Sequence, residues 1–211
     1  MADYSKPDYW SLKARKEGYP ARSVYKLIEI DEKFGLIKSG RPAKILDLGA
    51  APGSWSLCLM RRLSAGKPGF SLVSADILPL SRQYDHGLFD NPDFFFVQGD
   101  FTQPEIREAI LSRGPYSLIV SDAAPATTGN RSVDTLRSLD LAETVLDMAV
   151  SSLAVGGNFA SKVFQGTDTA EFLKKIKSMF ETGKSFKPQA CRAESFETYF
   201  IGLGKKPNVS A

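Results

Sequence analysis

Four aspartates and one lysine stand at or near the ends of successive apolar segments of this 211-residue chain: Asp47, Asp76, Asp100, Asp122 and Lys162. Carboxylates accept hydrogen bonds from a ribose diol or an amino group, and they stabilise a neighbouring cation. A lysine can orient or deprotonate an attacking hydroxyl. Any single acid here could equally cap a helix or a turn. The five residues together favour a binding and catalytic site.

A glycine turn follows the first of these apolar segments. Residues 45–56 read I-L-D-L-G-A-A-P-G-S-W-S, which is typical of the strand, turn and helix start of nucleotide-binding α/β units. Gly49 and Gly53 have the spacing G-x-x-x-G, which differs from the dinucleotide and phosphate-loop motifs. Pro52 also removes an N–H that a diphosphate could use. With Asp47 at the strand end, the turn favours a positively charged adenosyl ligand, and S-adenosylmethionine is the common one.

The other acids fit the same ligand. Asp76 would accept hydrogen bonds from the ribose diol, and Asp100 is placed for the adenine amino group. These contacts require the carboxyl ends of neighbouring strands to meet at one edge of a sheet.

Lys162 has two interpretations. Its stem lies between apolar strand residues, so it could simply form a structural ion pair with Asp122 of the neighbouring strand. Catalysis becomes more plausible if other charged groups converge there, and Lys26 and Glu197 are the candidates.

Strand-like and helical patterns alternate along the chain. The strand-like runs are 43–48, 70–75, 94–97, 117–121, 158–163 and 198–203. The helical stretches are 23–34, with Ser23 as its cap, 55–63, 104–111, 134–153 and 169–180. This alternation predicts an α/β fold with a mostly parallel sheet and helices on both faces. Segments 186–188 and 198–203 have no helix between them, so we expect a C-terminal antiparallel hairpin and the seven-stranded, Rossmann-like sheet of class I methyltransferases.

The composition predicts an ordinary globular protein. Hydrophobic residues make up 43% of the chain and charged residues 24%. We expect one domain over residues 1–211, whose polar segment 1–20 is flexible up to about Tyr9. The net charge of +3 is mild, but basic residues gather near the N-terminus: Lys6, Lys13, Arg15, Lys16, Arg22 and Lys26. This cluster indicates either a solvated face or a surface for a phosphate backbone.

Several classes of protein are disfavoured. Cys58 and Cys191 lack metal-site spacing and are typical of thiols in a reducing cytosol. The single histidine, His86, lies in a polar stretch that predicts a loop. We therefore expect no metal. No apolar run approaches the roughly twenty residues of a membrane span, and no secretory signal is present, so we expect a cytoplasmic protein. The sequence does not encode the oligomeric state, and we take a monomer without an obligate protein partner as the default.

Seven segments together resemble the FtsJ/RrmJ-type RNA 2'-O-ribose methyltransferases, from about Tyr19 to Leu203. They are 21–27 (A-R-S-V-Y-K-L), 47–53 (D-L-G-A-A-P-G), 76–79 (D-I-L-P), 98–101 (Q-G-D-F), 121–125 (S-D-A-A-P), 161–166 (S-K-V-F-Q-G) and 195–199 (S-F-E-T-Y). The resemblance implies an S-adenosylmethionine-dependent enzyme acting on RNA. Its catalytic tetrad falls on Lys26, Asp122, Lys162 and Glu197. Its cofactor contacts fall on Gly53, Trp55, Asp76, Asp100 and Asp122, to which the turn residues Asp47 and Gly49 are added.

The substrate and two sequence departures stay open at this level. Compact members of the family resemble the enzymes that modify a uridine in the A-loop of large-subunit ribosomal RNA, and relatives acting on the tRNA anticodon loop share the same motifs. A non-catalytic RNA-binding or ribosome-assembly factor is the alternative of another class. A nicotinamide-dependent dehydrogenase is disfavoured by the glycine spacing. Ser54 replaces the family's usual glycine, and residues 125–128 read P-A-T-T where the family has Pro-Asn.

RNA would be held by basic and aromatic side chains on the two sides of a cleft. The basic candidates are Lys13, Arg15, Lys16 and Arg22, with Arg192 or Lys187 opposite them. Tyr9, Trp10, Tyr19 and Tyr25 could stack on unpaired bases or could equally pack against the core.

Overall fold

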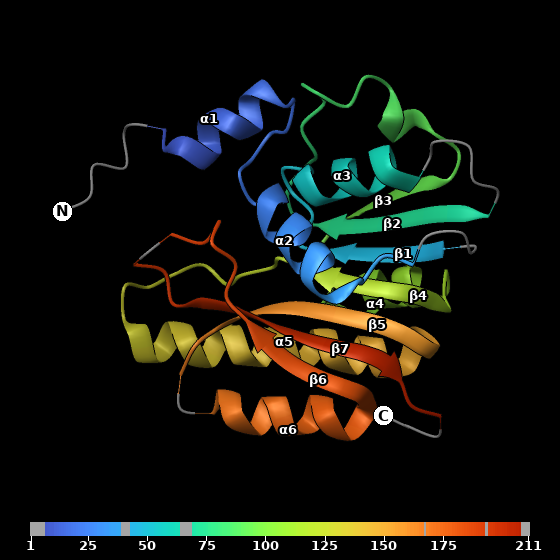
Figure 1. Cartoon of the computed structure of the whole chain (residues 1–211). Coiled ribbons are helices and arrows are strands. Elements are labelled where there is room, and N and C mark those ends of the chain that lie inside the picture. Colours follow the sequence, from blue (N-terminus) through green and yellow to red (C-terminus); the bar gives the residue numbers. More distant parts are fainter. Residues whose placement is uncertain (1–6, 39–42, 64–68, 167, 193, 208–211) are drawn as a thin grey trace.

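The computed structural model describes residues 7–38, 43–63, 69–166, 168–192 and 194–207. Within these ranges, seven strands form one sheet in the order β3-β2-β1-β4-β5-β7-β6 (Figure 1). They are β1 (Ala43–Leu48), β2 (Phe70–Asp76), β3 (Phe94–Gln98), β4 (Tyr116–Ser121), β5 (Leu153–Phe164), β6 (Phe180–Phe186) and β7 (Glu197–Lys205). Strands β1 to β5 are parallel, and β7 is antiparallel to both β5 and β6. The predicted sheet with its C-terminal hairpin is confirmed.

Helices cover both faces of the sheet (Figure 1). They are α1 (Tyr9–Lys16), α2 (Val24–Phe34), α3 (Ser54–Leu63), α4 (Pro104–Leu111), α5 (Arg131–Ser152) and α6 (Thr169–Met179), with a 3₁₀ turn at Leu88–Asp90. Helices α2 and α3 pack on one face, and α4, α5 and α6 pack on the other. None of the described helices is long and apolar enough to cross a membrane.

The two faces bury separate hydrophobic clusters. Leu46 of β1 packs among residues of α5 and α6, whereas its neighbour Ile45 packs among residues of α2 and α3. Successive side chains of a strand point to opposite faces, so a strand buried on both sides reads as a continuous apolar run. This burial fixes the register of the central strands and thereby the positions of the polar residues at their carboxyl ends.

Three local predictions were wrong. Strand β6 spans Phe180–Phe186 instead of 186–188. This edge strand is half solvated, with Phe180 and Gly183 buried, so its sequence lacks an apolar run. Strand β5 begins at Leu153, directly after α5, and not at residue 158 as predicted. Ser23 has helical backbone angles and no side-chain capping bond, so it does not cap α2 in the predicted way.

Helix α1 was not foreseen, because residues 9–16 have only one buried side chain, Ala14, and no apolar stripe. Asp8 caps the helix by accepting a hydrogen bond from the N–H of Ser11 at 2.8 Å. The helix starts at Tyr9, where the flexible opening was expected to end; residues 1–6 lie outside the described residues. The loop predicted around His86 is confirmed, and both cysteines are buried free thiols.

Candidate active site

A cavity of about 690 Å³ opens at the carboxyl ends of β1, β2, β3 and β4. Gly49, Asp76, Asp100 and Asp122 line it, together with apolar side chains that include Phe101. These residues stand at the carboxyl ends of four different strands, so the parallel order of the sheet gathers them at one edge. The predicted meeting of the acids at this edge is confirmed for three of them.

The turn after β1 needs glycine for two reasons. Gly49 has a φ of +73°, which L side chains rarely adopt. A Cβ there would lie 2.5 Å from the Cα of Ala123, which follows β4. The close approach of these two backbones shapes the floor of the cavity.

Backbone amides position the two acids on the cavity wall. Asp76 accepts hydrogen bonds from the N–H groups of Ala51 at 2.8 Å and Leu78 at 2.9 Å. Asp100 accepts from the N–H and the hydroxyl of Thr102, and these bonds hold its pKa below the usual value. Both carboxylates are therefore fixed in orientation before any ligand binds.

Three of the expected cofactor residues do not line this cavity. Asp47 is fully buried beneath the turn, where it accepts a hydrogen bond from Ser56 at 2.7 Å, and burial raises its pKa to about 7. A Cβ on Gly53 would meet Phe89 at 3.2 Å, so this glycine faces packed side chains. Trp55 is 2% exposed, because the start of α3 turns its indole inward to donate to the carbonyl of Ser23.

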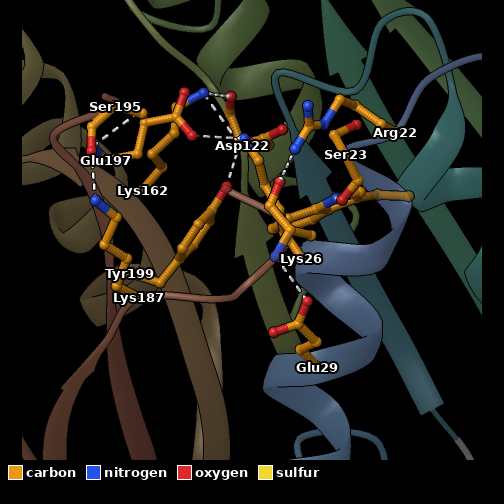
Figure 2. A network of polar contacts seen from close by, with 12 residues as sticks. Arg22, Ser23, Lys26, Glu29, Asp122, Lys162, Lys187, Ser195, Glu197 and Tyr199 are labelled. Carbon is orange, nitrogen blue, oxygen red and sulfur yellow. Dashed lines mark hydrogen bonds and ion pairs between the residues drawn. The ribbon is translucent and has the colours of Figure 1, made fainter. Parts of the chain in front are cut away.

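Figure 2 shows a cluster of charged side chains around Asp122, which lines the cavity. Lys162 Nζ lies 3.0 Å from Oδ1 of Asp122 and donates to the Asp122 carbonyl at 2.5 Å. Lys26 Nζ lies 3.8 Å from the same Oδ1 and 2.7 Å from Oε2 of Glu197. The structure thus brings together all four residues of the predicted tetrad, from α2, β5, β7 and the end of β4.

The charges in this cluster stabilise one another. Burial would raise the pKa of Asp122, but Lys162 and Lys26 hold it below its usual value. Burial would lower the pKa of Lys26, but Asp122 and Glu197 offset this and hold it above its usual value. Lys162 forms the ion pair with Asp122 that a purely structural role predicted. Lys26 and Glu197 also contact this group, as we expected if the site is catalytic.

A second cavity, of about 520 Å³, adjoins the cluster. Lys26 and Glu197 line it, as do Arg22, Arg192 and Thr127. Asp122 lines the first cavity, so the contact between Asp122 and Lys26 joins the two. Lys162 is 7% exposed and is not among the lining residues of either cavity.

Sequence reasoning missed Tyr199 and Asp134. The hydroxyl of Tyr199 donates to Oδ1 of Asp122 at 2.5 Å. Tyr199 stands two positions after Glu197, and this strand spacing could have placed both on one face. Asp134 accepts from the N–H groups of Thr128 and Gly129, which fixes the loop after β4, but no local pattern points to it.

Ser54, which departs from the family pattern, is accommodated without strain. Among the described residues His86 alone combines a side chain with a positive φ, so Ser54 does not need the conformation of glycine. Its hydroxyl accepts from the N–H of Ala21 at 2.8 Å and donates to the Ala21 carbonyl at 3.1 Å. Ser54 therefore ties the start of α3 to the segment that precedes α2.

The basic side chains predicted to bind RNA differ in their exposure and in their contacts with other residues. Arg15 and Lys16 are exposed on α1, whereas Lys13 lies 4.6 Å from the ring centre of Tyr25. Arg22 is paired with Asp8. Lys187 is exposed and donates to the carbonyl of Ser195 at 2.5 Å.

The prediction that Tyr25 could stack on an unpaired base is wrong. Tyr25 is 3% exposed, and its hydroxyl donates to Glu17. Trp10 packs on Tyr25 with ring centres 5.0 Å apart, and the guanidinium of Arg61 covers Tyr19 at 4.6 Å. Tyr9 is 68% exposed, and its ring packs at an angle on Trp10 with ring centres 5.3 Å apart.

Solved structures share this fold. A ribosomal RNA methyltransferase from Plasmodium falciparum is 25% identical, with a TM-score of 0.72 over 92% of this chain and all of that one. Human methyltransferase-like protein 13, solved with S-adenosylhomocysteine, is 12% identical, with a TM-score of 0.57 over 89% of this chain and 84% of that one. The second likeness concerns the fold alone, and it confirms the predicted Rossmann-like methyltransferase architecture.

Sequence comparisons agree with the geometry. The ribosomal RNA large subunit methyltransferase E of Treponema denticola is 48% identical over 203 residues, which cover 96% of this chain and 97% of the relative. The sequence model described as FtsJ-like methyltransferase matches residues 19–205. This match spans both cavities and the whole charged cluster. The chain therefore belongs to the family of FtsJ-like methyltransferases.

Proposed function

We propose that this protein transfers the methyl group of S-adenosylmethionine to a ribose 2'-hydroxyl of large-subunit ribosomal RNA, with a uridine of the A-loop as the expected nucleotide. The observation that carries the proposal is the contact of Lys26 with Asp122, at which two cavities meet. A transferase needs this arrangement because donor and acceptor must approach each other from two sides. We expect it to act as a cytoplasmic monomer.

The larger cavity fits S-adenosylmethionine. Asp76 would hold the ribose diol, Asp100 would accept from the adenine amino group, and exposed Ile77 and Leu78 offer apolar contact to the base. Asp122, kept ionised by its lysine neighbours, would stabilise the sulfonium charge. When bound there, the cofactor supplies an electrophilic methyl group.

The charged cluster would align the acceptor. Lys162 donates two bonds to Asp122 and has one more N–H, which would hold the 2'-oxygen in line with the methyl carbon. A reacting pair held near 3 Å gains several kcal/mol over free encounter. In this scheme Lys162 therefore acts as an orienting donor to the 2'-oxygen.

The acceptor side would position the ribose and receive the proton. Lys26 and Glu197 line the smaller cavity, where they would contact the ribose and fix the substrate. Methyl transfer would form the oxygen–methyl bond and break the carbon–sulfur bond, and Glu197 or water would accept the hydroxyl proton. No metal takes part in this scheme.

Phosphate contacts would hold the RNA outside the cavities. Arg15 and Lys16 on α1 and Arg192 on the wall of the smaller cavity are exposed and would contact phosphates, and Tyr9 could stack on an unpaired base. The name of the Treponema relative favours ribosomal RNA over tRNA as the substrate. The complete charged cluster disfavours a non-catalytic RNA-binding factor.

Mapping of 2'-O-methyl nucleotides tests the proposal. In a strain that lacks the gene, one methylated nucleotide of large-subunit RNA should disappear, and the purified protein should restore it with S-adenosylmethionine. Lys162→Ala serves as the inactive control. Loss of a methyl group from tRNA instead, or from no RNA, would overturn the proposed substrate.

A further inference from the structure

The connection between β6 and β7 is fastened to helix α2 by one carboxylate. Oε2 of Glu29 accepts a hydrogen bond from the N–H of Gln189 at 2.6 Å, and Oε1 accepts from the N–H of Ala190 at 2.9 Å. A carboxylate has an acceptor for each of two successive amides, and bonds to a charged group are stronger than neutral ones. Residues 160 positions apart in the sequence are thereby joined.

The same helix carries a residue of the active site. Glu29 stands three positions after Lys26 on α2, so the two side chains share one side of the helix. Lys26 reaches Glu197 at the start of β7, and Glu29 reaches the connection that leads into β7. Helix α2 thus holds this part of the chain at two points.

Arg22 binds the carbonyl of the same residue, Ala190, in the next peptide group. Its guanidinium donates to the carbonyl of Ala190 at 2.5 Å, while Glu29 accepts from the N–H of Ala190. Cys191, next in the chain, is 7% exposed. The backbone at residue 190 is therefore held from both directions, and Arg192 follows it on the wall of the smaller cavity.

We propose that Glu29 is a positioning residue that sets the acceptor side of the active site, an inference that rests on the proposed RNA methylation. By fixing residues 189 and 190, it determines where Arg22 and Arg192 stand relative to Lys26. It touches no reacting group. Its effect falls on the binding of RNA, because the cofactor cavity is built from the ends of β1 to β4 and does not include this connection.

Steady-state kinetics of Glu29→Gln test this role. The amide has one oxygen for two N–H groups, and its NH₂ would face a donor. We expect the KM for ribosomal RNA to rise about ten-fold, because charged hydrogen bonds of this strength are lost. We expect kcat to stay within about two-fold and cofactor affinity to be unchanged. Glu29→Asp keeps the charge on a shorter side chain, so its KM should lie between those of the wild type and Glu29→Gln.

Glu32→Gln is the matched control, since Glu32 is exposed on the same helix and loses the same charge. It should behave as the wild type. Amide hydrogen exchange gives a second readout: protection of Gln189 and Ala190 should fall in both Glu29 variants and stay in Glu32→Gln. If Glu29→Gln does not fold, Glu29→Asp carries the comparison.

The outcomes separate the two proposals. A wild-type KM in the Glu29 variants, or a fall in kcat with KM unchanged, overturns the role of Glu29. A wild-type protein that methylates no ribosomal RNA in the same assay overturns the proposed function, whatever the exchange data show for Glu29.

Discussion

The hydroxyl of Tyr199 donates a hydrogen bond to Oδ1 of Asp122 at 2.5 Å, and the ammonium of Lys162 lies 3.0 Å from the same oxygen. Tyr199 and Lys162 are partners in the antiparallel β5–β7 ladder. Opposite residues of such a ladder have neighbouring side chains. One pair of strands therefore supplies two donors to a single carboxylate oxygen.

Tyr199→Phe should destabilise the protein by about 1–2 kcal/mol, because a buried carboxylate loses a donor. The bond from Tyr199 helps to lower the pKa of Asp122, so this pKa should rise. Ionised Asp122 contributes stability that is present above its unfolded pKa and is lost as the pH falls through its folded pKa. Urea unfolding at several pH values should show this loss at a higher pH in the variant. If stability is lost at the same acidic pH in the variant and in the wild type, the argument is contradicted.

Lys162→Ala should abolish methyl transfer, with kcat at least about 100-fold lower, while cofactor affinity stays almost the same. The reason is that Lys162 contacts Asp122 without lining the cofactor cavity. Turnover of ribosomal RNA and titration of S-adenosylmethionine measure the two effects. Lys174→Ala, an exposed lysine of α6, is the control. Near-normal turnover of Lys162→Ala would refute the role.

Asp47→Asn should flatten the dependence of stability on pH. Asp47 is fully buried, and its Oδ1 has no hydrogen-bond partner among the described residues. Burial raises its pKa from 3.8 to about 7. Between these values the folded state binds a proton that the unfolded state has lost, so the free energy of unfolding falls as the pH rises from about 4 to 7.

The asparagine variant lacks this titration and should lose less stability over the same interval. Urea unfolding at each pH checks the slope. Asp93→Asn, at an exposed position, should keep the slope of the wild type. Parallel curves for wild type and Asp47→Asn would mean that Asp47 is ionised throughout.

Neutralising Lys13, Arg15 and Lys16 together should weaken RNA binding and reduce the slope of log K against log salt by about two to three, since each phosphate contact contributes almost one. Arg15 and Lys16 should account for most of the change, because Lys13 is engaged by the ring of Tyr25. Binding titrations at several salt concentrations measure the slope. Removing three lysines of α6 (Lys174, Lys175 and Lys177) is the charge-matched control. An equal effect in the control would exclude a specific role for α1.

The sequence by itself predicted the sheet and the positions of the central acids. Apolar runs buried on both faces of a parallel sheet are continuous and therefore easy to recognise. An acid such as Asp76 or Asp100 directly after such a run must lie at the carboxyl edge, where ligands bind. The edge strand β6 and the exposed helix α1 have no comparable pattern, so they were missed.

Tertiary structure decided which way each polar side chain points. Asp47 lies next to the last residue of β1 and Asp76 is the last residue of β2, yet the first is buried against Ser56 and the second lines the cavity. Trp55 likewise turned inward, because α3 packs one face on the sheet. Spacing along a chain places a residue at the end of a strand, but the packing of the next helix determines which side of the turn its side chain faces.

The long-range contacts of the site were also a matter of tertiary structure. Lys26 and Glu197 could be named from motifs, but Glu29 and Tyr199 act on residues 160 and 77 positions away. Such contacts arise when the β5–β7 ladder and helix α2 pack against each other, and no local pattern of charge or polarity encodes them.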